Sequence, residues 1–282
     1  MSDEVQSRGE YLLVRNMAES ERLEMQYKAW QANIGYLLHP AIKQHDRMRI
    51  ADVGTGTGIW LRDLAAILPI TCQLDGFDLS DVMFPRKNAL PENITFHHQN
   101  LLAPFPDEYL GEYDVVNVRV MLVALSDVEW EPAVRNLMTL LKPGGHLQWI
   151  DCPAHECVLK GEPEGKRATN ARYALDVFQR TLVSLGKTPN VAALHGTFQK
   201  SGLESCEERI YTLDNPGTRE DLNLTVVGGI QHFLTAALKM HKLDEIQSVD
   251  QITALREAML SDLHSLACYF CFDVFVIVGR KS

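Results

Sequence analysis

The sequence predicts an α/β protein with a doubly wound, Rossmann-like sheet of seven strands, and two observations predict this class. From residue 49 onward, short apolar segments alternate with amphipathic segments, which is the order that builds a parallel sheet covered by helices. The first apolar segment also runs directly into a glycine-rich turn, as in nucleotide-binding β-α-β units. A helical cap at residues 1–45 precedes a domain at 46–282, and a helical lid at about 216–266 is inserted into that domain.

The glycine-rich turn reads DVGTGTG from Asp52 to Gly58 and follows a strand predicted at 49–53. Its glycines let backbone N–H groups face a bound ligand without a Cβ in the way. The spacing argues against two common nucleotide motifs. A dinucleotide fingerprint needs glycine or alanine at position 59, where Ile59 stands, and a Walker A loop needs a Gly-Lys-Ser/Thr run that this turn lacks.

The second predicted strand, at 73–78, ends in Asp78. An acid about 20 residues after the last glycine is where a nucleotide-binding β-α-β unit contacts the ribose hydroxyls. Asp75 stands three residues earlier and is expected on the opposite face of the strand. The sequence therefore predicts Asp78 as the ribose-binding carboxylate.

The other elements follow from periodicity and from turn residues. Strands are predicted at 93–98, 113–118, 146–151, 203–211 and 269–278, and helices at 59–68, 130–141, 165–185 and 191–200. The helix at 165–185 is expected to pack on the sheet. The segment 218–266 is mostly helical and too long for a simple connection, which indicates the lid. Gly228 and Gly229 inside it predict a kink, a close approach of substrate, or tight helix packing.

The N-terminal cap is predicted from an apolar stripe whose members recur at spacings of three and four. The stripe consists of Leu23, Tyr27, Trp30, Ile34 and Leu37. It predicts an amphipathic helix that stops at His39-Pro40.

Composition narrows the functional classes. The chain has 46% hydrophobic and 23% charged residues and a net charge of −10, values typical of a globular protein and unfavourable for binding nucleic acid. No apolar run approaches the roughly 20 residues of a membrane span, so a cytoplasmic protein is expected.

The six cysteines are scattered, and Cys268 and Cys271 lack a second Cys/His pair at zinc spacing, so no metal site is expected. The oligomeric state stays open.

The turn at 52–58 resembles motif I of the class I S-adenosylmethionine (SAM) methyltransferases. Together with the segments 11–40 and 74–80, it makes the chain similar to fungal secondary-metabolite methyltransferases of the UMTA-like and gliotoxin-pathway N-methyltransferase-like family. The likeness covers residues from about 11 to 151. It implies that SAM is the cofactor, that a methyl group goes to O, N or S of a small secondary metabolite, and that the last strand runs antiparallel between the fifth and sixth.

The resemblance also implies a set of site residues. Asn100 stands where many relatives carry an Asp for the adenine amino group, and Arg119 falls near the methionine end, in contact through its backbone carbonyl. The expected cofactor residues are Tyr11, Gln26, Asp52, Gly54, Thr55, Gly56, Gly58, Asp78, Leu79, Asn100, Leu101 and Arg119. Trp149, at the end of the fifth strand, and His232 and Phe233, on the lid, are expected to contact the substrate.

No catalytic residue is assigned at this stage. Methyl transfer is an in-line displacement that depends mainly on positioning, and a general base is needed only when the acceptor carries a proton that must leave. Two alternatives keep the same fold. One is a pericyclase that binds SAM without transferring its methyl group, and the other is a non-enzymatic regulator with a methyltransferase-like domain.

Overall fold

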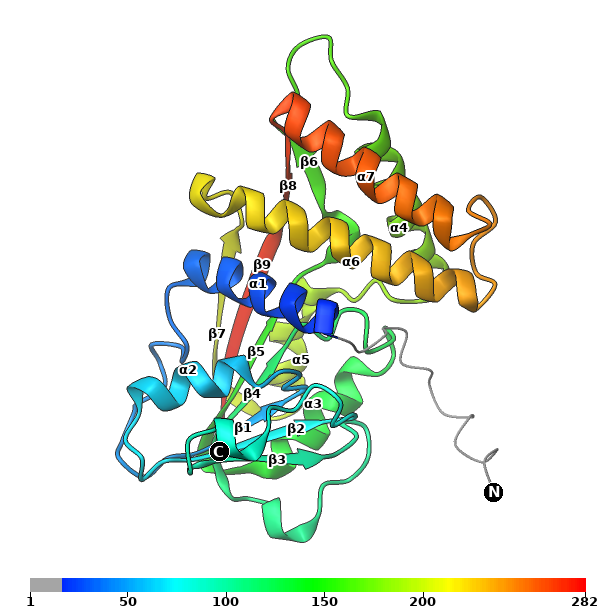
Figure 1. Ribbon diagram of the computed structural model, residues 1–282. Helices are drawn as coiled ribbons and strands as arrows, with labels where there is room; N and C mark the ends of the chain where they lie inside the picture. The colour runs from blue at the N-terminus through cyan, green and yellow to red at the C-terminus, as the bar shows by residue number, and fades with distance from the viewer. Residues whose placement is uncertain (1–16) are drawn as a thin grey trace, which may run out of the picture.

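A computed structural model describes residues 17–282 of the chain (Figure 1). Its centre is a seven-stranded sheet in the order β3-β2-β1-β4-β5-β9-β7. The strands are β1 (Arg49–Val53), β2 (Gln73–Asp78), β3 (Ile94–His98), β4 (Tyr113–Arg119), β5 (Leu141–Asp151), β7 (Leu203–Thr212) and β9 (Asp273–Lys281). The first five are mutually parallel, and β9 runs antiparallel to β5 and β7. The predicted fold class and the position of the last strand are confirmed.

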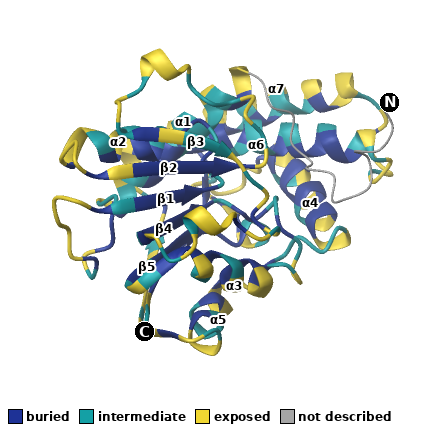
Figure 2. Ribbon diagram, turned by 90° about the horizontal axis from the view of Figure 1, so that it is seen from below, coloured by how far each residue is buried: buried dark blue, intermediate teal, exposed yellow. Residues whose placement is uncertain are grey.

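Helices cover both faces of the sheet. Figure 2 shows α2 (Ile59–Ile67) on one side of the buried strands and α3 (Trp130–Leu140) and α5 (Leu194–Lys200) on the other. The central strand β1 is buried along almost its whole length, as expected for a parallel strand with both faces covered. It pairs with both β2 and β4, so the strand order reverses at β1. In open α/β sheets, ligands bind beyond the carboxyl ends of the strands at such a point.

A second layer of helices lies beyond the carboxyl ends of the strands (Figure 1). It consists of α1 (Met17–Ile34), α4 (Thr169–Ser184), α6 (Arg219–Lys239) and α7 (Val249–Leu266), with a small antiparallel pair of strands, β6 (Val158–Lys160) and β8 (Tyr269–Cys271). The expectation that the helix at 165–185 packs on the sheet was wrong. This helix, α4, packs against α6 and α7, and the rings of Phe178 and Phe233 meet edge to face with centroids 5.0 Å apart. Periodicity predicted which face of this helix is buried, but not which elements that face packs against.

Several boundaries differ from the predicted ones for local reasons. The predicted strand at 269–278 is two strands, because Phe272 separates β8 from β9. The N-terminal helix ends at Ile34, before His39-Pro40, where Gly35 takes a positive φ of 84°. β5 begins at Leu141 and runs through Gly144. Among the described residues, the loops also contain short 3-10 helices, which are η1 (Lys87–Ala89), η2 (Asp107–Tyr109), η3 (Ala154–Glu156), η4 (Val191–Ala193) and η5 (Pro216–Thr218).

The glycine pair at Gly228 and Gly229 does not interrupt its helix, since α6 is continuous from Arg219 to Lys239. A Cβ on Gly228 would lie 2.9 Å from Cδ of Arg22 on α1, so tight helix packing is the alternative that the structure favours. Within residues 17–282, no helix combines the length and the apolar character needed to cross a membrane.

Candidate functional site

A cavity of about 1020 Å³ lies between the carboxyl edge of the sheet and the layer of α1, α4 and α6. The glycine turn and the loop after β4 form its floor, and α1 and α6 contribute to its opposite wall. This volume is at the upper end of the usual range for small-molecule sites. The cavity therefore has room for more than one small ligand.

The glycine turn has the conformation that its sequence predicts. Gly54, Gly56 and Gly58 all have positive φ, and the N–H of Gly56 donates a hydrogen bond of 2.9 Å to Oδ2 of Asp78. A Cβ on Gly58 would lie 2.3 Å from the ring of Phe96. Gly54, Thr55 and Gly56 line the cavity, whereas Gly58 does not, so the role of Gly58 is to let the turn pack against β3.

Asp52 is buried beneath the turn and begins a chain of hydrogen bonds across three strands, which we call the polar ladder. Its oxygens accept bonds of 2.7 Å from Thr55 Oγ1 and 2.8 Å from Asn117 Nδ2. Asn117 Oδ1 accepts a bond of 2.8 Å from Gln148 Nε2, and Gln148 Oε1 accepts one of 2.7 Å from the N–H of His39. Burial raises the pKa of Asp52 to about 6, although its hydrogen bonds oppose that rise. The ladder ties the turn to the segment that follows α1.

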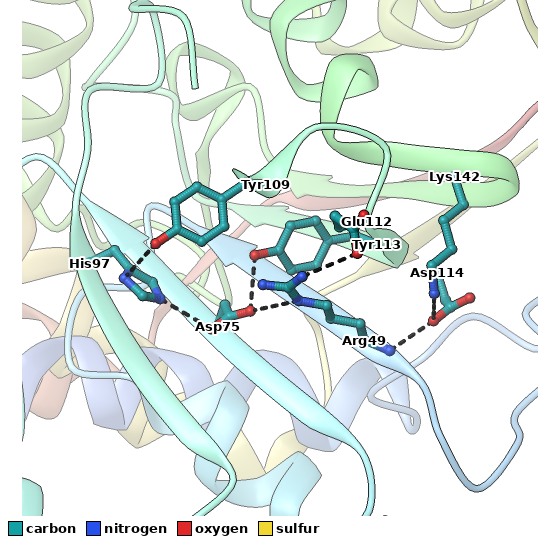
Figure 3. A network of polar contacts seen from close by, with 8 residues as sticks. All are labelled: Arg49, Asp75, His97, Tyr109, Glu112, Tyr113, Asp114 and Lys142. Carbon is teal, nitrogen blue, oxygen red and sulfur yellow. Dashed lines mark hydrogen bonds and ion pairs between the residues drawn. The ribbon is translucent and has the colours of Figure 1, made fainter. Parts of the chain in front are cut away.

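The two carboxylates of β2 lie in different surroundings. Asp78 lines the cavity and is 7% exposed, and its Oδ1 accepts a bond of 3.1 Å from the N–H of Ser80. Asp75 instead lies within a polar cluster away from the cavity (Figure 3), where Arg49 Nε, His97 Nε2 and Tyr113 Oη lie 3.2, 3.1 and 2.9 Å from its oxygens. Only Asp78 is in a position to meet a ligand in the cavity.

The end of β3 and the loop after it form another part of the cavity wall. Leu79, Asn100 and Leu101 all line the cavity. The Asn100 side-chain oxygen already accepts a bond of 2.9 Å from the N–H of Leu102, so a second donor would share an oxygen that also holds the local turn. The sequence pattern did not predict this local bond.

Arg119, at the end of β4, brings its side chain to the cavity. The guanidinium is almost fully buried, lies 4.6 Å from the centroid of the Tyr27 ring, and lines the cavity. Its Nη1 has no hydrogen-bond partner within residues 17–282. Burial lowers the pKa of Arg119. A buried donor without a partner is costly, so this nitrogen marks a position for an anionic or carbonyl group of a ligand.

The wall opposite the turn comes from α1 and α6. Gln26 lines the cavity and its Oε1 accepts a bond of 2.7 Å from Arg22 Nη1. Tyr11 lies outside the described residues. His232 and Phe233 of α6 both line the cavity, in agreement with their expected place beside a substrate.

Trp149 does not line the cavity, so its expected contact with substrate is corrected. Its ring is fully buried and stacks on Trp130 of α3 with centroids 5.0 Å apart. Alternate residues of a strand face opposite sides of the sheet. Gln148, its neighbour in β5, faces the polar ladder, and Trp149 consequently faces α3.

Two residues that line the cavity from α1, Glu19 and Arg22, were not predicted from the sequence. Arg22 donates to Glu19 from Nε at 2.8 Å and from Nη2 at 2.6 Å. Spacings of three and four place Glu19, Arg22 and Gln26 on one helix face, which the sequence contains. Glu19 pairs with His232 of the neighbouring helix α6, which is more than 200 residues away in sequence, so this pairing was not predictable from spacing.

The residues of this cavity fit SAM. The unpartnered Arg119 nitrogen suits the carboxylate of its methionine end, and Asp78 beside the glycine turn suits the ribose hydroxyls. In residues 17–282 no group of three or more His, Cys, Asp or Glu side chains is arranged to hold a metal ion.

Comparison with known proteins agrees with this geometry. Residues 50–145 match a family model described as a methyltransferase domain. The chain is 35% identical to methyltransferase grgD of a Penicillium species over 299 residues that cover all of both proteins. It is 32% identical to N-methyltransferase tcpN of Claviceps purpurea over 203 residues, which cover 71% of this chain and 70% of the relative.

Solved structures show the same fold. A Haloferax volcanii putative methyltransferase, in complex with its activator Trm112, superposes with a TM-score of 0.53 at 17% identity, covering 95% of this chain and 99% of that chain. Phosphoethanolamine N-methyltransferase 2 of Haemonchus contortus, in complex with SAM, gives a TM-score of 0.50 at 18% identity, covering 90% of this chain and 53% of the other. The chain therefore belongs to the class I SAM-dependent methyltransferases, within the family of fungal secondary-metabolite enzymes that includes grgD and tcpN, and it catalyses methyl transfer from SAM.

Proposed function

We propose that this enzyme methylates a small, largely apolar secondary metabolite that binds between α4, α6 and the end of β5. One observation carries the proposal: the cavity is polar at one end and apolar at the other. The polar end contains the glycine turn, Asp78 and Arg119, while Leu122, Phe178, Phe233 and Phe272 line the other end. Pockets lined mainly by apolar and aromatic side chains recognise apolar, often ring-bearing, small molecules.

The polar end supports an assignment of SAM contacts. Asp78 would accept hydrogen bonds from the ribose hydroxyls, and the Asn100 oxygen would accept one from the adenine amino group beside Leu101. The Arg119 guanidinium would pair with the carboxylate of the methionine end, which gives Nη1 the partner it lacks. SAM supplies an electrophilic methyl group on its sulfonium. Gln26, and Tyr11 in the N-terminal segment, are proposed to close over the cofactor.

The remaining parts of the functional proposal concern the acceptor and the setting of the enzyme. Relatives such as tcpN are named N-methyltransferases, which favours nitrogen over oxygen or sulfur as the acceptor atom. A cavity lined largely by apolar atoms in a chain of net charge −10 favours a small molecule over nucleic acid. The division into a cap at 1–45 and a domain at 46–282, and a cytoplasmic location, stay predictions.

Two measurements test this proposal. Calorimetry should show binding of SAM and of its demethylated product S-adenosylhomocysteine (SAH), because both carry the groups that the polar end recognises. Incubation with a fungal metabolite extract and methyl-labelled SAM, followed by mass spectrometry, should then find a labelled small-molecule product. A product of unchanged mass would instead indicate a pericyclic reaction, and label found only in nucleic acid or protein would contradict the small-molecule assignment.

A further inference from the structure

A charged cluster at the crossing of α1 and α6 lies on the cavity wall and has no role in binding the cofactor as described above. Glu19 is 4% exposed, and its Oε2 lies 2.8 Å from Nδ1 of His232. Arg22 holds the same carboxylate through two nitrogens, and its Nη1 also contacts the Thr225 carbonyl oxygen at 3.4 Å. Glu19, Arg22 and His232 all line the cavity. Charged side chains are rarely buried unless they are paired, and these three are paired with one another.

The partners of His232 fix which of its nitrogens carries the proton. Burial opposes ionisation of Glu19, but hydrogen bonds from Arg22 and His232 outweigh it and lower the pKa of Glu19, so the group is a carboxylate at neutral pH. A carboxylate accepts a hydrogen bond, so Nδ1 of His232 must be the donor. In the neutral imidazole, Nε2 then carries the lone pair.

The lone pair of Nε2 accepts no hydrogen bond from residues 17–282. This nitrogen is buried and has no hydrogen-bond partner within the part of the chain that the structure describes. The side chain to which it belongs lines the cavity. An imidazole held by a carboxylate on one nitrogen, with the other nitrogen unpaired in a side chain that lines the cavity, is the arrangement of a general base.

The helix packing holds this arrangement in place. Arg22 crosses α6 at Gly228, where its Cδ lies 2.9 Å from the position of a Cβ, so only glycine leaves room for the arginine in this position. Along α1, Glu19 is about two turns, or roughly 12 Å, from Tyr27, against which Arg119 stacks. Along α1, the cluster is therefore separated from the position of Tyr27 and its contact with Arg119.

We propose that His232 is the general base of the methyl transfer, that Glu19 is its positioning residue, and that the acceptor is protic, with an N–H or O–H group rather than a thiolate. This inference rests on the proposed function, because it needs an acceptor in the apolar end of the cavity. It narrows that function, because a thiolate has no proton to lose and would need no base.

The proposed step balances in atoms and charge. A lone pair of the acceptor atom forms the bond to the methyl carbon while the sulfur–methyl bond breaks, and its electron pair stays on sulfur in the neutral thioether SAH. The proton of the acceptor passes to Nε2 of His232. The imidazolium then carries the positive charge that was on the sulfonium, and the carboxylate of Glu19 stabilises it until the proton leaves to solvent.

The first test needs no turnover. In full-length protein labelled with ¹⁵N in histidine and saturated with SAH, long-range ¹H–¹⁵N spectra at pH 8 report the tautomer of each imidazole, and His232→Gln identifies the signal. We expect His232 to be protonated on Nδ1, and Glu19→Gln to weaken that preference. A wild-type His232 protonated on Nε2 would overturn the proposal, because that nitrogen would then have no lone pair to accept a proton.

The second test compares two aromatic probes, 2-naphthol and 2-naphthalenethiol, as acceptors of a labelled methyl group. His232→Gln should slow transfer to the naphthol by about 10²- to 10⁴-fold, the usual contribution of a general base. Transfer to the thiol, which is largely ionised at pH 8, should change little. Equal losses with both probes would show a structural role, and an unchanged rate with the naphthol would show that His232 is not the base.

Two further variants complete the design. Glu19→Gln should move the acid limb of the naphthol pH–rate profile to lower pH, because the imidazolium loses its neighbouring carboxylate; a rate lowered equally at every pH would contradict its positioning role. His264→Gln, an exposed histidine on α7, is the matched control and should behave as wild type. SAH binding and methylation of the thiol that persist in His232→Gln would leave the proposed function intact even if the base assignment fails.

Discussion

The Asp75 cluster and the cavity wall both contain buried polar groups, yet they differ in how these groups are partnered. In the Asp75 cluster (Figure 3), Arg49, His97 and Tyr113 surround one carboxylate, and the cluster contributes no unpartnered buried atom among the described residues. On the cavity wall, Nη1 of Arg119 and Nε2 of His232 have no partner there.

Within residues 17–282, unpartnered buried atoms also occur away from the cavity, for example Ser201 Oγ and Arg219 Nε, so only those whose side chains line the cavity are candidates for binding a ligand. A buried polar atom without a partner costs roughly 1 to 3 kcal/mol, so a fold tolerates one where something else compensates. A cluster whose polar atoms all have partners stabilises the protein by itself. A cluster with an unpartnered atom is completed only when a ligand supplies the missing hydrogen bond. Variants in the two regions should therefore change different measurements.

The largest expected effect is on cofactor binding in Arg119→Met. Loss of a buried charged partner should weaken SAH binding by about 3 to 5 kcal/mol in calorimetry. Stability without ligand should stay within about 1 kcal/mol of wild type, because the variant also removes a poorly compensated buried charge. Arg49→Met is the matched control: it should lower the melting temperature and leave SAH affinity unchanged. The reverse pattern would show that the two regions have been assigned wrongly.

Asp75→Asn should destabilise the fold by about 3 to 4 kcal/mol in urea unfolding, since Arg49 and His97 would lose their anionic partner. SAH affinity should not change. A large loss of SAH binding in the folded variant would mean that Asp75, and not Asp78, meets the cofactor.

The pH dependence of stability should have opposite signs for two buried carboxylates. The folded-state pKa of Asp52 is raised to about 6 from 3.8, so this group makes the free energy of unfolding fall as pH rises from about 4 to 6, by about 3 kcal/mol. Burial opposes ionisation of Asp75, but hydrogen bonds from His97 and Tyr113 lower its pKa, so its contribution is present above its unfolded pKa and is lost as pH falls. Urea unfolding between pH 3 and 7 should test both contributions. Asp52→Asn should abolish the fall in the free energy of unfolding as pH rises from about 4 to 6, and Asp75→Asn should abolish the loss of stability as pH falls. Identical profiles for the two variants would contradict this difference.

Asp78→Ala should weaken SAH binding by about 2 kcal/mol, the magnitude of hydrogen bonds to a charged group. The fold should be retained, but the melting temperature should fall by a few degrees, because the N–H groups of Gly56 and Ser80 lose their acceptor. Calorimetry checks the affinity, and an SAH affinity equal to wild type would exclude Asp78 as the ribose partner.

The smallest expected effect concerns the glycine pair of α6. Both Gly228→Ala and Gly229→Ala gain about 1 kcal/mol of helix propensity. A Cβ at position 228 must displace Arg22, whereas one at 229 would lie 3.6 Å from Nη1 of Arg22, an ordinary contact. Urea unfolding should therefore find Gly228→Ala less stable than Gly229→Ala by about 1 kcal/mol. Equal stabilities would mean that the crossing of α1 and α6 adjusts without cost.

The sequence predicted best what local chemistry determines. The bounds of β1 and β2 and the conformation of the glycine turn follow from short-range patterns, and the structure reproduces them. The predictions were wrong where the partner of a buried face mattered: α4 packs on the lid helices, and Trp149 faces α3 instead of the cavity. The pairing of Glu19 with His232 depends on how two distant helices cross, which no spacing within either helix reveals.

The position of β9 has a consequence for how the chain folds during synthesis. β9 is the last strand along the chain, yet it lies between β5 and β7 and provides the only pairing of β7 within the seven-stranded sheet. Residues 273–281 must therefore be synthesised before the sheet can close. Until then β5 has an exposed edge and β7 has no partner in this sheet, and both invite aggregation. β7 carries Glu204, Glu207, Glu208 and Arg209. Such charges disfavour the pairing of β7 with another chain before β9 is in place.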